Sequence, residues 1–306
     1  MDTGSRCSQF LACALGAAAL FSASPVRLQG QAPERRVVLV SVLDQEGNHV
    51  PGLSAAHFRG ECQGRPVTIL SAAEDSTPRR VSVVVDVSGS QEQSAGLEWQ
   101  QAVQLIDGLI PAHAVALFTL GRVLTKHADF TNDRAVLQRA MRDARAGRAG
   151  GPSALYDGVV QAALGFPGPQ LGDTICLFSD GVDTSSEQPA ADVARRLTDL
   201  RIRVFLAGTT TTWDARGPVP EWRTITDATG GLIVWNDSAR PDPASVARVR
   251  QRVLAGITNA YRLDLAFERG IDRFREWKLQ LADSARAATG NARVIYPRRL
   301  APLAKQ

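Results

Sequence analysis

The stretch Val81-Ser82-Val83-Val84-Val85-Asp86-Val87-Ser88-Gly89-Ser90 decides the fold of this 306-residue chain. Its first part is an almost entirely apolar, β-branched run, which is typical of a strand buried on both faces in a parallel sheet. The run ends in Asp-x-Ser-x-Ser, whose oxygen-bearing side chains alternate along one short loop. Open α/β sheets place their ligand sites beyond the carboxyl ends of such strands. The stretch therefore predicts an oxygen-rich site, suited to a hard cation such as Mg²⁺, at the edge of an α/β sheet.

Two further segments support this interpretation, which the short motif alone would not carry because Ser, Asp and Gly are common in turns. Residues 150–158 form a glycine-rich loop that opens a helix, with the hydroxyl of Ser153 at its start. Residues 175–181 form a second apolar strand, which ends in Asp180. In this order the three segments resemble the von Willebrand factor A-domain family, in which they form a metal-ion-dependent adhesion site. The resemblance implies a doubly wound, mostly parallel six-stranded sheet.

The same resemblance implies a set of metal ligands and a mode of binding. The implied ligands are Asp86, Ser88, Ser90, Ser153 and Asp180. The metal would be Mg²⁺, or else Mn²⁺ or Ca²⁺, and a carboxylate from a partner protein would fill its free coordination position. The family usually has Thr preceded by Gly where this chain has Ser153 preceded by Pro152, and the missing methyl predicts weaker affinity. Alternatively, Ser88 and Ser90 cap a helix and Asp180 makes a turn.

The loops that follow the parallel strands should form a rim around this site, at 87–93, 145–153, 180–186 and 208–218. Arg142, Arg145 and Arg148 lie just before Ser153, where they would favour an acidic partner, although solvated charge is the alternative. Trp213 lies in the long loop 208–218 and is a candidate contact residue, unless it packs back onto its own domain. The predicted partner-binding residues are Trp213, Arg145 and Arg148, and Asp157 and Asp183 are expected to support or cap the site.

The sequence favours a binding protein over an enzyme. The histidines lack metalloprotease spacing, no nucleophile elbow or phosphate-binding loop occurs, and no general base is evident. The net charge is only +4, with basic residues scattered along the chain, so a nucleic-acid partner is not expected. Two alternatives stay open, which are a metal-free scaffold that binds by shape and, more weakly, a metal-dependent hydrolase.

The N-terminus has the pattern of a secretory signal peptide. Arg6 precedes an apolar run from Phe10 to Ala23, which is followed by Ser24-Pro25, and the run is shorter than the ~20 residues of a membrane span. We therefore expect a secreted or periplasmic protein whose mature chain has no membrane span. Of the cysteines, Cys62 and Cys176 would remain after cleavage, and we expect two inert thiols rather than a disulfide.

Composition and periodicity divide the chain into a signal peptide (1–32), an N-terminal β segment (33–80), an A domain (81–258) and a C-terminal β segment (259–306). Within 33–80 we expect strands at 37–43 and 66–71, a return edge at 50–53 and a turn at 60–64. This pattern resembles a leader in secreted bacterial A-domain-related proteins first noted in Acidobacteria. Residues 261–267 and 277–281 alternate with period two. We expect both flanks to pack together as one β module beside the A domain.

Within 81–258 strands alternate with helices, which indicates a largely parallel sheet. The predicted strands are 81–86, 114–119, 122–127, 173–179, 201–207 and 231–235. Only a two-residue connection separates the second and third of these strands, which is too short for a parallel crossover, so 122–127 should be an antiparallel edge strand.

Overall fold

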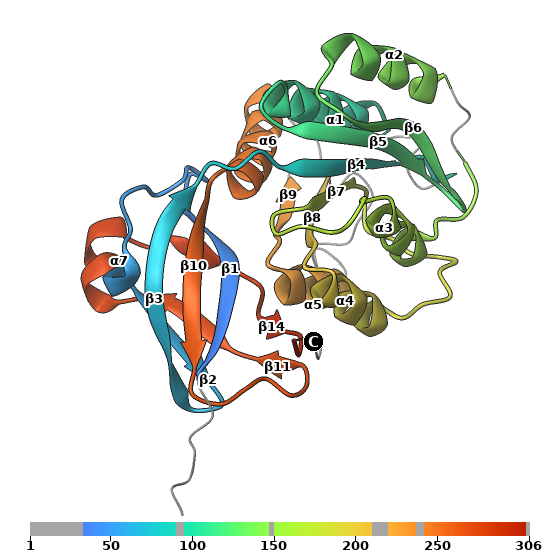
Figure 1. The fold of residues 1–306 in the computed structure, drawn as a ribbon. Helices are drawn as coiled ribbons and strands as arrows, with labels where there is room; N and C mark the ends of the chain where they lie inside the picture. The colour runs from blue at the N-terminus through green and yellow to red at the C-terminus, as the bar shows by residue number, and fades with distance from the viewer. Residues whose placement is uncertain (1–32, 90–94, 147–149, 210–219, 237–241, 304–306) are drawn as a thin grey trace, which may run out of the picture. The chain divides into compact units, whose positions relative to one another are not determined.

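The computed structural model describes residues 33–89, 95–146, 150–209, 220–236 and 242–303, which contain two six-stranded sheets and a two-stranded pair (Figure 1). The sheet that carries the candidate site has the strand order β6-β5-β4-β7-β8-β9. All neighbours in it are parallel except β5 and β6, which form the expected hairpin. Its strands are β4 (Arg80–Asp86), β5 (Ala114–Leu120), β6 (Leu124–Thr131), β7 (Thr174–Phe178), β8 (Arg203–Thr209) and β9 (Ile233–Asn236).

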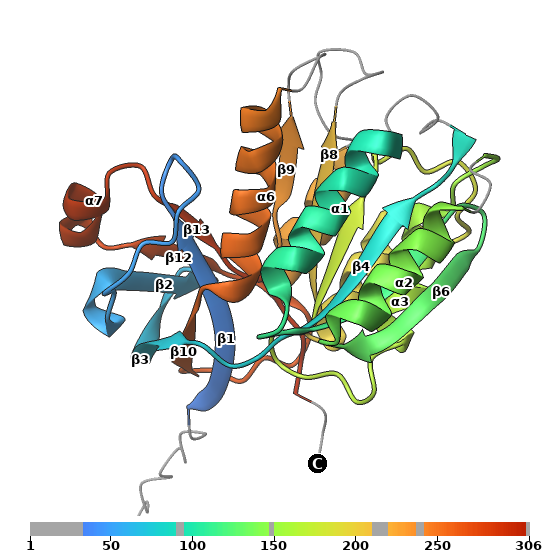
Figure 2. The same cartoon turned by 90° about the horizontal axis from the view of Figure 1, so that it is seen from above.

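Helices cover both faces of this sheet (Figures 1 and 2). One core cluster joins α1, α2 and α6 to one face through side chains such as Leu105, Leu137 and Val253. A second cluster joins α3, α4 and α5 to the other face. The helices are α1 (Ala95–Leu109), α2 (Arg134–Arg145), α3 (Leu155–Leu164), α4 (Ala190–Asp199), α5 (Pro220–Thr229) and α6 (Pro243–Thr258). The structure thus has the doubly wound, mostly parallel α/β architecture that the sequence predicted.

Strand β4 shows why its sequence is so uniformly apolar. Val81, Val83 and Val85 pack in one core cluster and Val84 packs in the other, and all four side chains are buried. A strand between two helical layers must bury both of its faces, so a continuous β-branched run is required there rather than an alternating one. Asp86 ends β4 and is the first side chain of the candidate site.

The N- and C-terminal flanks pair into the second sheet, in the order β12-β2-β3-β10-β1-β13. Strand β1 pairs antiparallel with β10, with Val38 opposite Leu263, so the two flanks form one β module as expected. These strands are β1 (Glu34–Leu43), β2 (Phe58–Cys62), β3 (Arg65–Asp75), β10 (Ala260–Phe267), β12 (Lys278–Leu281) and β13 (Arg293–Ile295). The short elements η1 (Ala55–His57), β11 (Arg275–Glu276), α7 (Asp283–Thr289) and β14 (Arg299–Leu300) complete the described fold.

The β segment differs from the sequence prediction in two places. Of the expected return edge at 50–53, only Val50 bonds to β1, with its N–H donating to the Val42 carbonyl at 2.9 Å. The edge does not continue, because Gly52 has φ +76° and the Leu53 N–H donates to the Tyr261 hydroxyl at 3.1 Å. The expected turn at 60–64 is present but shorter, since Gly60 lies inside β2. The chain reverses at Gln63 and Gly64, whose φ angles of 53° and 73° are left-handed.

A buried polar contact ties the β module to the α/β sheet. Arg203, at the start of β8, donates to the Ser41 hydroxyl of β1 at 3.1 Å and to the Gly256 carbonyl of α6 at 2.9 Å. Both Cys62 and Cys176 are free thiols. Across the described ranges, no helix has the length and apolar character needed to cross a membrane.

Candidate metal-binding site

The loop after β4 holds the Asp86 carboxylate in a fully buried position. The backbone N–H of Ser88 donates to one carboxylate oxygen at 2.8 Å, and the Ser179 hydroxyl donates to the other at 2.6 Å. Burial, with a smaller contribution from nearby Asp180, raises the pKa of Asp86 to about 6, although the bonds from Ser179 and Ser88 partly offset the rise. The two hydrogen bonds therefore fix the orientation of the Asp86 carboxylate, while its burial disfavours the charged form.

The glycine loop before α3 lies directly against this first loop. The Gly89 N–H donates to the Gly151 carbonyl at 2.9 Å, and the Gly150 N–H donates to the Val87 carbonyl at 2.8 Å. Gly150 and Gly151 have φ angles of 139° and 84°, a conformation that glycine adopts without strain. These bonds place Ser153 at the same edge of the sheet as Asp86.

The backbone of Val182 links Ser153 to Asp180 through its N–H and its carbonyl. Asp180 accepts a hydrogen bond from the Val182 N–H at 2.9 Å, and the Ser153 hydroxyl donates to the Val182 carbonyl. Both side chains are buried. A hydroxyl that donates its hydrogen keeps its lone pairs, so the Ser153 oxygen is still able to coordinate a cation.

Ser179 is a site residue that the sequence analysis did not identify. Its hydroxyl donates to Asp86 and accepts from the Gly181 N–H at 2.9 Å, so it connects the ends of β4 and β7. The signal was visible, since Ser179 stands beside Asp180 at the end of an apolar strand, next to the predicted aspartate.

Glu98 of α1 was also missed. Its side chain is fully buried, and neither carboxyl oxygen has a hydrogen-bond partner among the residues that the structure describes. Burial raises the pKa of Glu98 well above its usual value, and the charges of Asp86 and Asp180 raise it further. Gln101, one turn later, is likewise buried and has no partner for its amide within the described ranges. Glu98 stands four residues before Ala102, in line with Leu105 and Leu109, so helical periodicity could have placed it on the buried face.

The remaining predicted residues have mixed outcomes. Asp157 accepts from the Glu187 N–H at 2.8 Å, and Asp183 accepts from the Tyr156 N–H at 3.0 Å, so both hold the loops around α3 in place. Arg145 lies exposed in the last turn of α2. Ser90, Arg148 and Trp213 lie outside the described residues.

The donor set fits a hard divalent cation. Asp86 and Glu98 form no ion pair with any Lys or Arg in the described part of the chain, and their pKa values are raised mainly by burial and further by neighbouring carboxylates. A cation would relieve this repulsion, and carboxylate and hydroxyl oxygens are the ligands that Mg²⁺ prefers. The described residues contain no cluster of three or more His, Cys, Asp or Glu side chains able to hold a metal, so hydroxyls would have to supply part of the shell.

Comparison with known proteins agrees with this architecture at the level of the fold. No protein-family model and no curated protein matches the chain. A solved von Willebrand factor type A structure from Catenulispora acidiphila has a TM-score of 0.50 and 15% identity, and the match covers 90% of this chain and 75% of that one. Proximal thread matrix protein 1 from the mussel byssus was solved with a zinc-occupied MIDAS (metal-ion-dependent adhesion site) motif. It has a TM-score of 0.50 and 14% identity over 62% of this chain. The match covers only 49% of the mussel protein. The chain therefore contains a domain with the fold of the von Willebrand factor A domain.

Proposed function

We propose that this chain is an extracytoplasmic interaction protein that uses a divalent cation to hold an acidic group of a partner protein. One observation carries the proposal: the buried Asp86 and Ser153 side chains both bond to the loop that carries the buried Asp180, at the carboxyl edge of the sheet. Support also comes from the mussel protein of similar fold, whose MIDAS motif was solved with zinc. The expected ion here is Mg²⁺, with Mn²⁺ or Ca²⁺ as substitutes.

Each described residue has a distinct part in the proposed site. Ser88 and Ser153 would give hydroxyl oxygens to the ion, while Asp86 and Asp180 would neutralise its charge directly or through water. Ser179 fixes the orientation of the Asp86 carboxylate. When bound, the cation supplies a positive charge and a coordination position that an outside carboxylate can occupy. The predicted contacts of Arg145, Arg148 and Trp213 with the partner belong to the same proposal.

The proposal is tested by titrating the purified protein with Mn²⁺ in a calorimeter. We expect binding by the wild type and none by Asp86→Asn. The matched control is Asp107→Asn, which removes the carboxylate of an exposed aspartate paired with Arg134. Binding that survives in Asp86→Asn would overturn the assigned site, and binding lost in Asp107→Asn would show that the loss is not specific.

The metal-free scaffold is the second candidate. It is favoured by the internal bonds of the site, since the Ser153 hydroxyl donates to the Val182 carbonyl and Asp86 accepts from the Ser179 hydroxyl, so protein groups give both side chains hydrogen-bond partners. If neither Mg²⁺ nor Mn²⁺ binds the wild type at millimolar concentration, this candidate replaces the first.

The proposed role is binding rather than catalysis. His113 accepts a hydrogen bond from the Arg79 N–H at 2.9 Å and His127 bonds the Thr119 hydroxyl at 2.8 Å, so neither imidazole is bonded to a site residue. A metal-dependent hydrolase would reveal itself as Mn²⁺-dependent turnover of phosphoesters or peptides that disappears in Asp86→Asn.

A further inference from the structure

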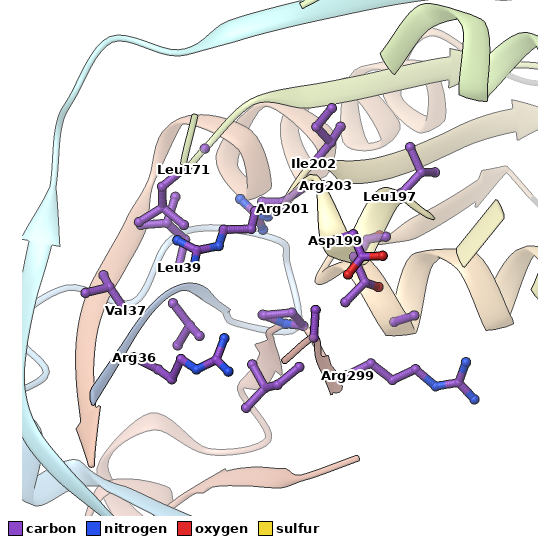
Figure 3. A pocket seen from close by; sticks show the side chains of 18 of the residues that line it. Arg36, Val37, Leu39, Leu171, Leu197, Asp199, Arg201, Ile202, Arg203 and Arg299 are labelled. Atoms are coloured by element: carbon purple, nitrogen blue, oxygen red, sulfur yellow. The ribbon is translucent and has the colours of Figure 1, made fainter. Parts of the chain in front are cut away.

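A cavity lies away from the candidate metal site, where the amino ends of β7 and β8 meet the β module (Figure 3). Its volume is about 500 Å³, which is within the usual range of small-molecule pockets. Strand β1, the end of α4 and the segment after β13 contribute its walls. The apolar part of the lining is aliphatic and includes Val37, Leu39, Leu171, Leu197, Ile202 and Leu300.

Arg36 of β1 brings an incompletely satisfied charge to this cavity. Only 8% of the residue is exposed, and its Nε donates to Glu34. Its Nη2 is buried and has no hydrogen-bond partner among the described residues. Figure 3 shows the guanidinium directed from β1 toward the side chains that line the cavity. Because a buried donor without an acceptor is costly, this position calls for an acceptor from outside the protein.

The rest of the lining carries an excess of positive charge. Arg203 is buried and donates to the carbonyls of Gly230 and Gly256, which are neutral acceptors. Burial, together with the nearby Arg79, lowers the pKa of Arg203 to about 9, so it is still protonated at neutral pH. Arg201 adds a further charge at the exposed side of the cavity.

Acidic groups offset only part of this charge. Glu34 pairs with Arg36 and Glu276 pairs with Arg299, while Asp199 is the one acidic residue in the lining itself. Arg201 and Arg203 together therefore outweigh Asp199. A negatively charged ligand group is favoured here, and a cationic one is disfavoured.

We propose that this cavity binds an amphiphilic carboxylate, with the carboxylate at Arg36 and an aliphatic chain against the leucine-rich wall. One unpartnered donor suits a single anionic head better than a phosphate with several oxygens. The aliphatic lining selects a flexible hydrocarbon body, because each methylene removed from water favours binding. The site is independent of the proposed cation site, since it uses none of the same residues.

Decanoate, kept below its micelle concentration, is the probe for this proposal. Calorimetry of the purified protein should show saturable binding of decanoate. Decanol keeps the chain without the charge, and acetate keeps the charge without the chain. Both should therefore bind at least tenfold more weakly. Equal binding of decanol would overturn the role of the arginines, and no decanoate binding would overturn the site.

A pair of variants tests the assignment of Arg36. Arg36→Met keeps an unbranched side chain but removes the guanidinium, and it should weaken decanoate binding at least tenfold. Arg134→Met removes an exposed arginine of α2 that pairs with Asp107, so it should leave binding unchanged. If Arg36→Met binds decanoate as the wild type does, the proposal is wrong. A Mn²⁺ titration of the same variant separates this outcome from a failure of the cation site.

Discussion

Replacing Asp86 by Asn should stabilise the cation-free protein at neutral pH while removing cation binding. Burial of Asp86 raises its pKa from 3.8 to about 6. The folded protein therefore holds this proton more tightly than the unfolded chain does, and the free energy of unfolding falls as the pH rises from about 4 to about 6. A rise of the pKa from 3.8 to about 6 corresponds to about 3 kcal/mol in the free energy of unfolding, and above pH 6 the wild type has lost this amount relative to pH 4.

Asparagine avoids this loss because it has no proton to release. Its amide oxygen can still accept from the Ser88 N–H, and its amide nitrogen can donate to the Ser179 hydroxyl, which has the lone pairs to accept. We expect the variant to be about 3 kcal/mol more stable than the wild type at pH 8 and about equally stable near pH 4.

Urea unfolding in the presence of a chelator, at pH 4.5 and pH 8, measures this difference. Asp107→Asn is the control and should change the free energy of unfolding by no more than about 0.5 kcal/mol at either pH. Adding Mg²⁺ at one hundred times its dissociation constant should stabilise the wild type by about 2.7 kcal/mol and leave Asp86→Asn unchanged. The reasoning is refuted if the variant is less stable than the wild type at pH 8, or if its stability keeps the wild-type pH dependence.

Three further substitutions test the surroundings of the site. Glu98→Gln removes a buried acid that raises the local negative charge, so we expect weaker Mn²⁺ binding in calorimetry together with higher stability at pH 8 in urea. Ser153→Ala removes a proposed ligand and should weaken Mn²⁺ binding at least tenfold, whereas Ser153→Thr should not weaken it. Gly208→Ala would place a Cβ inside contact distance of the Ser179 carbonyl and should cost about 1–3 kcal/mol in urea unfolding, together with weaker Mn²⁺ binding. Its control is Gly96→Ala in α1, where a Cβ meets nothing within 4 Å and stability should hold or rise.

The sheet and the position of its site were predictable because both depend on local sequence signals. A continuous apolar run specifies a strand buried on both faces, and parallel strands must present their carboxyl ends at one edge. Asp86 and Asp180 follow such runs, so their proximity follows from topology without knowledge of any contact. The hairpin of β5 and β6 was predictable for a similar reason, since its connection is too short for a crossover. Its exact bounds were not, because β6 begins at Leu124 and extends to Thr131.

Local sequence signals did not predict the place of Glu98 in the site. A carboxyl on the buried face of α1 contradicts the rule that charged residues face solvent, so hydrophobic patterning alone assigns it to the surface. Only its register with Ala102 and Leu105 indicates burial, and register does not reveal that Asp86 and Asp180 lie close enough to raise its pKa. Residues that act on a site electrostatically from another element are therefore harder to predict than the residues at the ends of its strands.

The pairing of the two flanks marks a different limit, in which the strands and their common module are predictable but the neighbours and register of each strand are not. Period-two alternation at 261–267 identifies a strand with one buried face, yet it is compatible with any neighbour. In the structure β10 lies between β1 and β3, and Tyr261 donates its hydroxyl to the Val50 carbonyl at 2.7 Å, a contact between residues 211 positions apart. That bond also explains why the return edge does not continue beyond Val50, because the Val50 carbonyl and the Leu53 N–H are both bound to the Tyr261 hydroxyl. The local error in the N-terminal segment and the missing long-range partner therefore have the same physical cause.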